Sequence, residues 1–94
     1  MTKFIIKIEL YGNPDDENYH LLTDAMEAAT FSSKVILSGI LYWLPPAVYI
    51  WEGTATIQAV EALTVEAVLP IWADYGIMIT KTDSFIGYLN LRPV

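Results

Sequence analysis

The fold that this chain can adopt is most constrained by residues 31–53, with the sequence FSSKVILSGILYWLPPAVYIWEG. Seventeen residues between Lys34 and Glu52 carry no formal charge, which approaches the length of a membrane-spanning helix. Ser38-Gly39 and Pro45-Pro46 divide this run, however, and both pairs are typical of turns or strand edges. The many β-branched and aromatic residues also favour strands. The stretch therefore predicts a β-hairpin, and we expect no membrane segment.

The hairpin has a predicted register. Strands over 31–37 and 40–51 would be joined by a two-residue turn at Ser38-Gly39, so Lys34 would lie opposite Trp43. Pro45-Pro46 indicates an edge strand or a bulge, because proline cannot donate to a ladder. Residues that pair across strands share a face. The inward face is predicted to hold Val35, Leu37, Ile40, Tyr42, Leu44, Val48 and Ile50. The outward face is predicted to hold Lys34, Ile36, Trp43, Tyr49 and Trp51.

Strands are predicted at both ends of the chain. Residues 3–11 alternate, with Phe4, Ile6, Ile8 and Leu10 on one face and polar side chains interspersed on the other, as in a half-buried strand. A further strand is predicted over 75–82 and a shorter one over 85–91.

Two helices are predicted between the strands. The first is expected to start with Asn13 as the N-cap and Pro14 at its first position, and to run to about residue 30. Its core-facing side chains would be Tyr19, Leu22, Met26 and Ala29. The second is expected at about 56–69, capped by Thr54 or Thr56. Its core-facing side chains would be Ile57, Val60, Leu63 or Thr64, Ala67 and Val68.

The resulting order is β-α-β-β-α-β with a short extra C-terminal strand. Two helices with a hairpin between them suit an α+β, ferredoxin-like sandwich, in which both helices cover one face of an antiparallel sheet. The 94 residues make one domain, spanning 1–94.

Charge and cysteine content narrow the function classes. The net charge is −6, which disfavours binding to a DNA duplex by bulk electrostatics and leaves nucleic-acid binding to a local basic patch. The absence of cysteine excludes disulfides, a thiolate nucleophile and Cys-based zinc sites. One histidine cannot build a His-rich site, so neither a metal nor a cofactor is predicted. The N-terminus does not read as a signal peptide, so we expect a cytoplasmic protein.

The predicted outward face mixes basic and aromatic side chains. It would gather Lys3, Lys7, Tyr11, Lys34, Trp43, Tyr49, Trp51, Tyr88 and Arg92. Such a surface can stack single-stranded RNA bases. The same residue types are enriched in protein interfaces, and a chain that is 54% hydrophobic is expected to expose apolar side chains and to form a homodimer. The residues favour an RNA-binding surface or a dimer interface at Lys7, Tyr11, Lys34, Trp43, Tyr49, Trp51 and Arg92, and both alternatives remain open.

No catalytic signature is present. His20 is the one side chain of the type best suited to acid–base chemistry near neutral pH, although a single surface histidine is usually only that. The run Asp15-Asp16-Glu17 is better explained by the helix dipole than by a cation site.

The chain as a whole resembles the GhoS-type antitoxin family. The resemblance rests on the first strand KFIIKIELYG, on a helix with Met26 leading to Phe31-Ser32-Ser33, on the spacing Tyr42-x-Leu44-Pro45-x-Ala47-x-Tyr49 before Gly53, and on Ile79-Thr80 ahead of a short C-terminal strand. It implies a small cytoplasmic antitoxin of a type V toxin–antitoxin system, with a ferredoxin-like fold. Such proteins are endoribonucleases that cut single-stranded RNA, namely the mRNA of a membrane-active toxin. No catalytic residue can be carried over. The alternative is a non-catalytic, dimerising interaction module that uses the aromatic sheet face.

Overall fold

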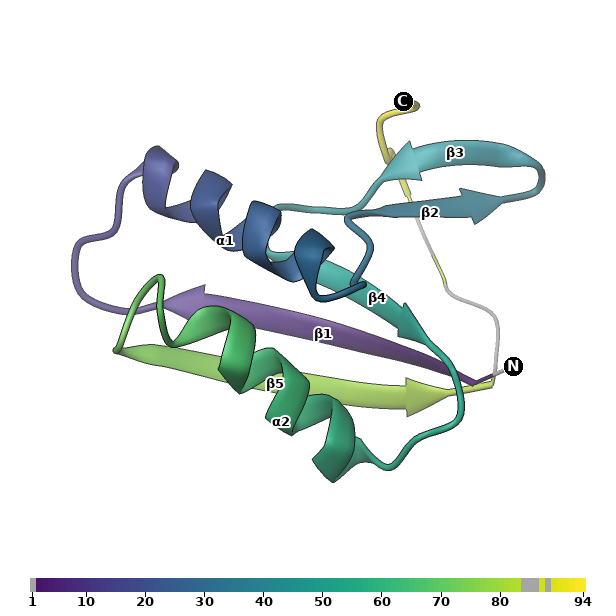
Figure 1. Cartoon of the computed structure of the whole chain (residues 1–94). Coiled ribbons are helices and arrows are strands. Elements are labelled where there is room, and N and C mark those ends of the chain that lie inside the picture. Colours follow the sequence, from purple (N-terminus) through teal and green to yellow (C-terminus); the bar gives the residue numbers. More distant parts are fainter. Residues whose placement is uncertain (1, 84–86, 88) are drawn as a thin grey trace.

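Strand β1 (Lys3–Leu10) forms the centre of an antiparallel sheet with the order β4-β1-β5. The computed structural model describes residues 2–83, 87 and 89–94. Its elements run in the order β1, α1 (Asp16–Ala28), β2 (Lys34–Leu37), β3 (Ile40–Trp43), β4 (Val48–Glu52), α2 (Ile57–Val68) and β5 (Tyr75–Thr82) (Figure 1). The fold class is α+β, as the element pattern predicted.

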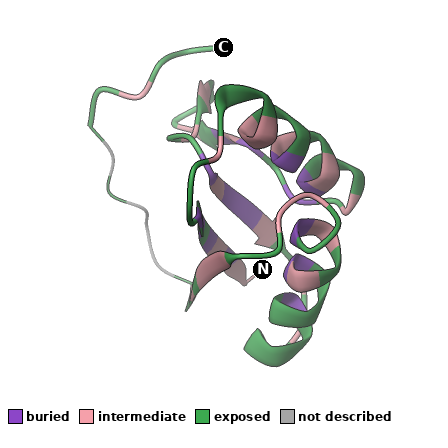
Figure 2. Cartoon of the chain, turned by 90° about the vertical axis from the view of Figure 1, so that its left-hand side faces the viewer, coloured by how far each residue is buried: buried purple, intermediate pink, exposed green. Residues whose placement is uncertain are grey.

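Both helices cover one face of this sheet (Figure 2). The predicted alternation in β1 is confirmed, because Phe4, Ile6, Ile8 and Leu10 are all buried. Helix α1 adds Leu22 and Met26 to the core, and α2 adds Val60, Thr64 and Val68. Fully burying a large apolar side chain contributes about 1.5–3 kcal/mol, so this layer between sheet and helices provides most of the stability.

The start of α1 differs from the prediction. Asp15, not Asn13, is the N-cap, and its carboxylate accepts a hydrogen bond from the Asn18 backbone N–H at 2.9 Å. The Asn18 side-chain oxygen accepts one from the Asp15 N–H at 2.9 Å in return. This reciprocal capping box satisfies two backbone donors at once, which a cap two residues earlier would not do. In α2, the second of the two predicted caps, Thr56 and not Thr54, is confirmed, with Thr56 Oγ1 accepting from the Ala59 N–H at 3.1 Å.

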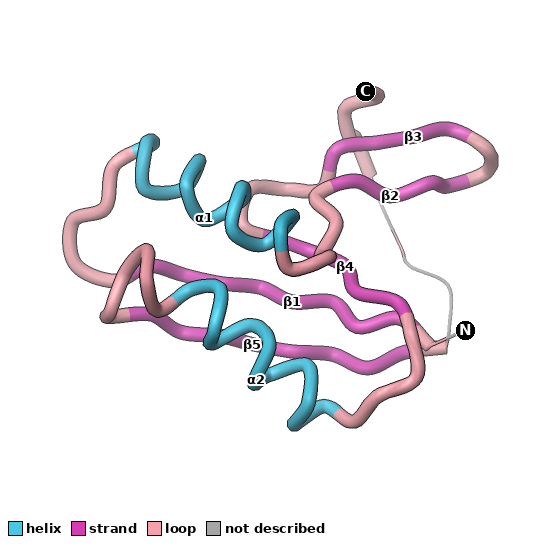
Figure 3. The backbone as a smooth tube through the Cα atoms, in the orientation of Figure 1, coloured by secondary structure: helices cyan, strands magenta, loops and turns pink. Residues whose placement is uncertain are grey.

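The predicted hairpin of β2 and β3 is confirmed. Lys34 pairs with Trp43 and Leu37 with Ile40. Ser38 and Gly39 both have positive φ angles, 51° and 81°, which is the backbone of a type I′ turn. Figure 3 shows that this hairpin stands apart from the three-stranded sheet. It is joined to the sheet through Ser32, which exchanges two backbone hydrogen bonds with Ile50 of β4.

The prediction of one long strand over 40–51 is wrong. Residues 44–47, which include Pro45 and Pro46, separate β3 from β4, and Ala47 has a positive φ of 61°. This break changes which side chains face the helices. Tyr49 and Trp51 pair with Ile6 and Phe4 of β1 and share their core-facing side, whereas Val48 and Ile50 lie on the opposite face. The predicted orientations of these four residues are therefore reversed.

The C-terminal segment returns to the hairpin. The Trp43 N–H donates to the Arg92 carbonyl at 2.8 Å, and the Val94 N–H donates to the Leu41 carbonyl at 3.0 Å. The strand predicted over 85–91 includes residues 85, 86 and 88, which lie outside the described residues, while residues 89–91 are not in a strand. Across the described part of the chain, no helix has the length and apolar character needed to cross a membrane.

Candidate functional site

A cleft of about 460 Å³ lies between helix α1 and the chain that leads from the hairpin into β4. It brings together a histidine, a glutamate, a lysine, hydroxyl groups and two aromatic rings. Its lining residues are His20, Thr23, Glu27, Ser33, Lys34, Trp43, Leu44, Pro45, Pro46, Ala47, Val48 and Tyr49.

One wall of the cleft is a face of α1. His20, Thr23 and Glu27 are spaced at i, i+3 and i+7, so they lie along one side of the helix. The Ser33 hydroxyl, just before β2, donates to Glu27 Oε2 at 3.0 Å. This bond ties the end of the helix to the start of the hairpin and holds the Glu27 carboxylate at the cleft.

The opposite wall is the Lys34–Trp43 pair of the hairpin. The Lys34 ammonium lies 4.8 Å from the centre of the Trp43 ring, within the range of a cation–π interaction. The Ser32 hydroxyl accepts from the Lys34 N–H at 3.1 Å and donates to the Lys34 carbonyl at 2.8 Å. Trp43 remains 44% exposed, so its ring stays accessible to a ligand.

Tyr49 lies against α1 at the base of the cleft. Its hydroxyl is 2.8 Å from the Thr23 hydroxyl. Burial raises the pKa of the Tyr49 phenol above its usual range, while the hydrogen bond with Thr23 lowers it. The Glu27 carboxylate and Tyr19 raise it further. Tyr49 is therefore a neutral group at physiological pH and serves to position Thr23.

The Pro45-Pro46-Ala47 segment forms the rim. The Ala47 carbonyl accepts from the Ile8 N–H of β1 at 3.0 Å, and the Pro46 carbonyl accepts from the Lys7 ammonium at 3.4 Å. Lys7 thus brings a second positive charge to the rim from the face of the sheet away from the helices. The positive charge of Lys34 offsets the negative charge of Glu27, so the cleft is close to neutral although the chain has a net charge of −6.

The structure separates the residues that the sequence placed on one outward face. Lys34, Trp43 and Tyr49 line the cleft, and Lys7 adjoins it. Arg92 lies beside β3, where its carbonyl bonds to Trp43. Trp51 instead packs edge-on against Phe4 at 5.7 Å between ring centres. Tyr11 lies at the far end of β1, where its carbonyl accepts from the Trp72 indole N–H at 2.7 Å; Tyr88 lies outside the described residues.

Sequence reasoning missed Thr23, Glu27 and Ser33 as members of one site with His20. The helical spacing of His20, Thr23 and Glu27 was a usable signal, because it places three polar side chains on one side of α1. Nothing in the sequence indicated that this side would meet the hairpin, since that contact depends on the break at Pro45-Pro46.

No group of three or more His, Asp or Glu side chains within the described residues is arranged to hold a metal ion. Comparison with known proteins assigns no relative, because no family model, curated protein or solved structure matches the chain.

Proposed function

We propose that the protein binds single-stranded RNA at the α1–hairpin cleft and cleaves it, as an antitoxin-type endoribonuclease. The observation that carries this proposal is the convergence of His20, Lys34 and Trp43 on one cleft. These side chains supply a proton acceptor, a cation for phosphate and an aromatic surface for a base. A base, a cation and a stacking surface for RNA are thereby lined up in one cleft.

Within the α+β class, we propose that the fold is a ferredoxin-like sandwich. Its support is the strand order β5-β1-β4, which the Ser32–Ile50 bridge extends from β4 toward β2. In this reading β3 and β4 are two halves of one strand that Pro45-Pro46 interrupts. The same fold is expected from the resemblance to the GhoS-type antitoxins.

Binding rests on stacking and on local positive charge. A base stacked on an aromatic ring contributes about 1–3 kcal/mol and needs no particular sequence, and Trp43 offers an exposed ring for it. Lys34 at the ring and Lys7 at the rim are placed to meet the phosphates that flank the stacked base. Because these are few cations on an acidic chain, binding is expected to be selective for unpaired RNA and weak for duplexes.

The proposed chemistry uses the ribose 2′-hydroxyl as the nucleophile. His20 accepts the 2′-hydroxyl proton while the 2′-oxygen forms a bond to the adjacent phosphorus, with Glu27 as the second proton acceptor in the cleft. The bond from phosphorus to the 5′-oxygen breaks, and that oxygen takes up a proton from water. The products are a 2′,3′-cyclic phosphate and a 5′-hydroxyl end. Lys34 stabilises the charge that develops on the phosphate oxygens.

The biological setting follows from the resemblance alone. It would be a cytoplasmic antitoxin that acts on the mRNA of a small toxin.

The alternative is a non-catalytic module that binds another protein through the hairpin. It is favoured by the exposed apolar side chains there, of which Ile36 is 68% exposed. The aromatic sheet face expected for this alternative loses Tyr49 and Trp51, because both face the helices, and keeps Trp43 and Tyr11, which are both 44% exposed.

The test is incubation of the purified protein with a labelled A/U-rich single-stranded RNA, with and without EDTA. Cleavage that persists in EDTA is expected. A preparation that binds this RNA without cutting it under either condition would remove the enzyme proposal, and one that neither binds nor cuts it would favour the protein-binding alternative.

A further inference from the structure

Strand β5 occupies an edge of the sheet, because the order is β4-β1-β5. It is eight residues long, contains no proline and carries one charged side chain, Lys81. Natural proteins usually protect such an edge with prolines, charges or a covering segment. The edge of β3 is protected in this way by the C-terminal residues that bond to Trp43 and Leu41. Within the described part of the chain, residues 75–81 of β5 have no strand or bridge partner on their outer edge.

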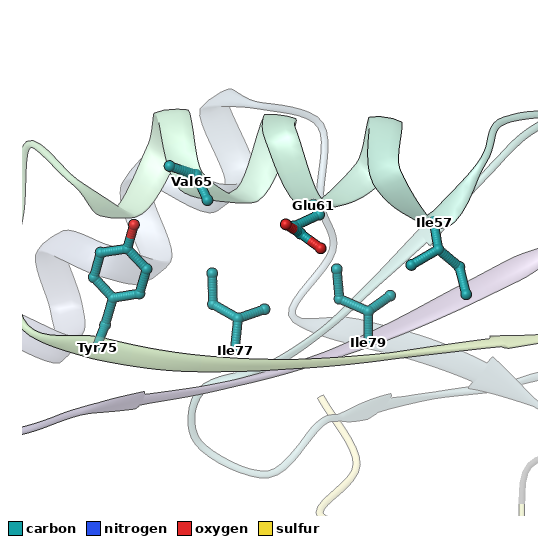
Figure 4. Close-up of a pocket in the computed structure, with 6 residues that line it drawn as sticks. All are labelled: Ile57, Glu61, Val65, Tyr75, Ile77 and Ile79. Atoms are coloured by element: carbon teal, nitrogen blue, oxygen red, sulfur yellow. The ribbon is translucent and has the colours of Figure 1, made fainter.

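A groove of about 410 Å³ follows this edge between β5 and α2 (Figure 4). Ile77 and Ile79 point from β5 toward the helix, and Ile57 and Val65 of α2 point back toward the strand. The groove is completed by Glu61 and Tyr75. On the other face of β5, Met78 is 70% exposed. The edge therefore offers apolar side chains on both faces and backbone groups between them.

We propose that a second copy of the chain pairs with this edge, β5 against β5 in antiparallel orientation, about a two-fold axis at Met78. In this register Met78 faces Met78 of the other copy. Ile77 faces Ile79, and Tyr75 faces Lys81. Paired residues of a continuous sheet must lie on the same face. This register satisfies that condition, because the two residues of each of the three pairs lie on the same face of β5. It joins the two sheets into one of six strands.

The side chains of β5 suit a second copy better than an arbitrary strand. The two Ile77–Ile79 pairs extend the two α2 grooves into one apolar layer, and the two methionines cover each other on the opposite face. Each Lys81 lies opposite Tyr75 of the partner strand, one residue along the chain from Asp74, so the positively charged end of one strand meets the negatively charged end of the other. Shifting the register by two residues in either direction removes this match. It places Lys81 opposite Ile77, or moves it beyond the start of the partner strand.

The absence of cysteine gives a direct test. In the proposed dimer the Cα atoms of the two Met78 residues would be about 4.5–5.5 Å apart, which is within reach of a disulfide. Met78→Cys should therefore form a covalent dimer rapidly under mild oxidation. Thr80→Cys is the matched control on the same face of the same strand, because its two copies would lie about 13 Å apart. Ile36→Cys tests self-association through the hairpin.

The expected result is cross-linking of the Met78→Cys variant alone, together with a dimeric mass for the unmodified protein by sedimentation at micromolar concentration. Circular dichroism checks that each variant is folded. Met78 is exposed, so its replacement by cysteine is expected to leave the fold intact. Equal cross-linking at all three positions, cross-linking only through Ile36→Cys, or a monomeric mass would overturn the proposal. RNA cleavage is measured independently, since the cleft shares no lining residue with the β5 edge.

Discussion

The Lys34 ammonium lies 4.8 Å above the ring of Trp43, its direct partner across the β2–β3 hairpin. The turn at Ser38-Gly39 fixes this pairing, and the Ser33–Glu27 hydrogen bond anchors the neighbouring backbone against α1. The pair thus combines a cation and an exposed aromatic surface at the mouth of a cleft whose other wall carries His20. The proposed RNA site depends on this relationship.

Trp43 fluorescence should report RNA binding. In a Trp51→Phe/Trp72→Phe background, Trp43 is the only tryptophan left. A single-stranded A/U-rich RNA is expected to quench its emission through base stacking. Adding Lys34→Glu should weaken RNA binding about tenfold. It should also reduce the slope of log K against log salt concentration by about one.

Lys81→Glu is the matched control for this experiment, because it makes the same charge change at a side chain that lies over the Phe4 ring, away from the cleft. Equal weakening by Lys34→Glu and Lys81→Glu would mean that overall charge, not the cleft, governs binding.

Core packing by α1 can be tested with two adjacent leucines. Leu22 is fully buried, whereas Leu21 is 43% exposed. Leu22→Ala should lower the free energy of unfolding by about 2–5 kcal/mol, since it removes buried methyl groups and leaves a cavity. Leu21→Ala should cost less than about 1 kcal/mol. Urea unfolding followed by circular dichroism measures both; similar losses would be inconsistent with the orientation of α1.

The turn conformation makes a backbone prediction. A Cβ at Gly39 would meet no atom within 4 Å, but the φ angle there is +81°. Gly39→Val should therefore destabilise the protein by about 1–2 kcal/mol through backbone strain alone. Gly39→Asn should cost much less, because asparagine tolerates the left-handed region. Thermal unfolding of the two variants gives the comparison, and indistinguishable midpoints would argue against a type I′ turn.

The raised pKa of Tyr49 predicts a loss of stability at alkaline pH. Below pH of about 10, the usual pKa of tyrosine, the phenol is protonated in both the folded and unfolded states. As pH rises above this value, the unfolded chain loses the proton while the folded protein retains it, so unfolding becomes more favourable. This part of the stability is lost as pH rises toward the folded-state pKa, which burial raises.

The Tyr49→Phe variant isolates this effect. At pH 7 it should be less stable than the wild type by about 1 kcal/mol, because Thr23 loses its hydrogen-bond partner. The difference in free energy of unfolding between the two proteins should shrink as pH rises above about 10. A constant difference from pH 7 to pH 11 would show that the Tyr49 phenol is not shielded from water.

Much of the fold was predictable from local patterns. The alternation in β1, the strand Tyr75–Thr82, the Thr56 cap and the Lys34–Trp43 pairing all depend on neighbours in sequence or on a two-residue turn. Such local rules need no knowledge of the tertiary structure. The orientation of Tyr49 and Trp51 was wrong because it required counting through Pro45-Pro46. The positive φ of Ala47 changes the alternation there, and no local rule predicts that angle for alanine.

The candidate site was predicted in part. Lys34 and Trp43 were identified because they share a hairpin face. His20 was noted, but not as a neighbour of that pair. Its proximity arises from the packing of α1 against the start of β4, where Thr23 meets Tyr49 across 26 positions in the chain. Sequence spacing carries no information on contacts between residues so far apart in the chain. The Thr23–Tyr49 contact was also missed because Tyr49 was predicted to face the other way.

Cleavage of a matched pair of substrates tests the central claim most directly. One is an A/U-rich single-stranded RNA and the other is the same strand with 2′-O-methyl riboses, which lack the attacking hydroxyl. The account predicts that the wild type cuts only the RNA and leaves 2′,3′-cyclic phosphate ends, and that the folded His20→Ala variant cuts it at least 100-fold more slowly. Cleavage of both strands, or full activity of His20→Ala, would contradict the proposed chemistry of the cleft.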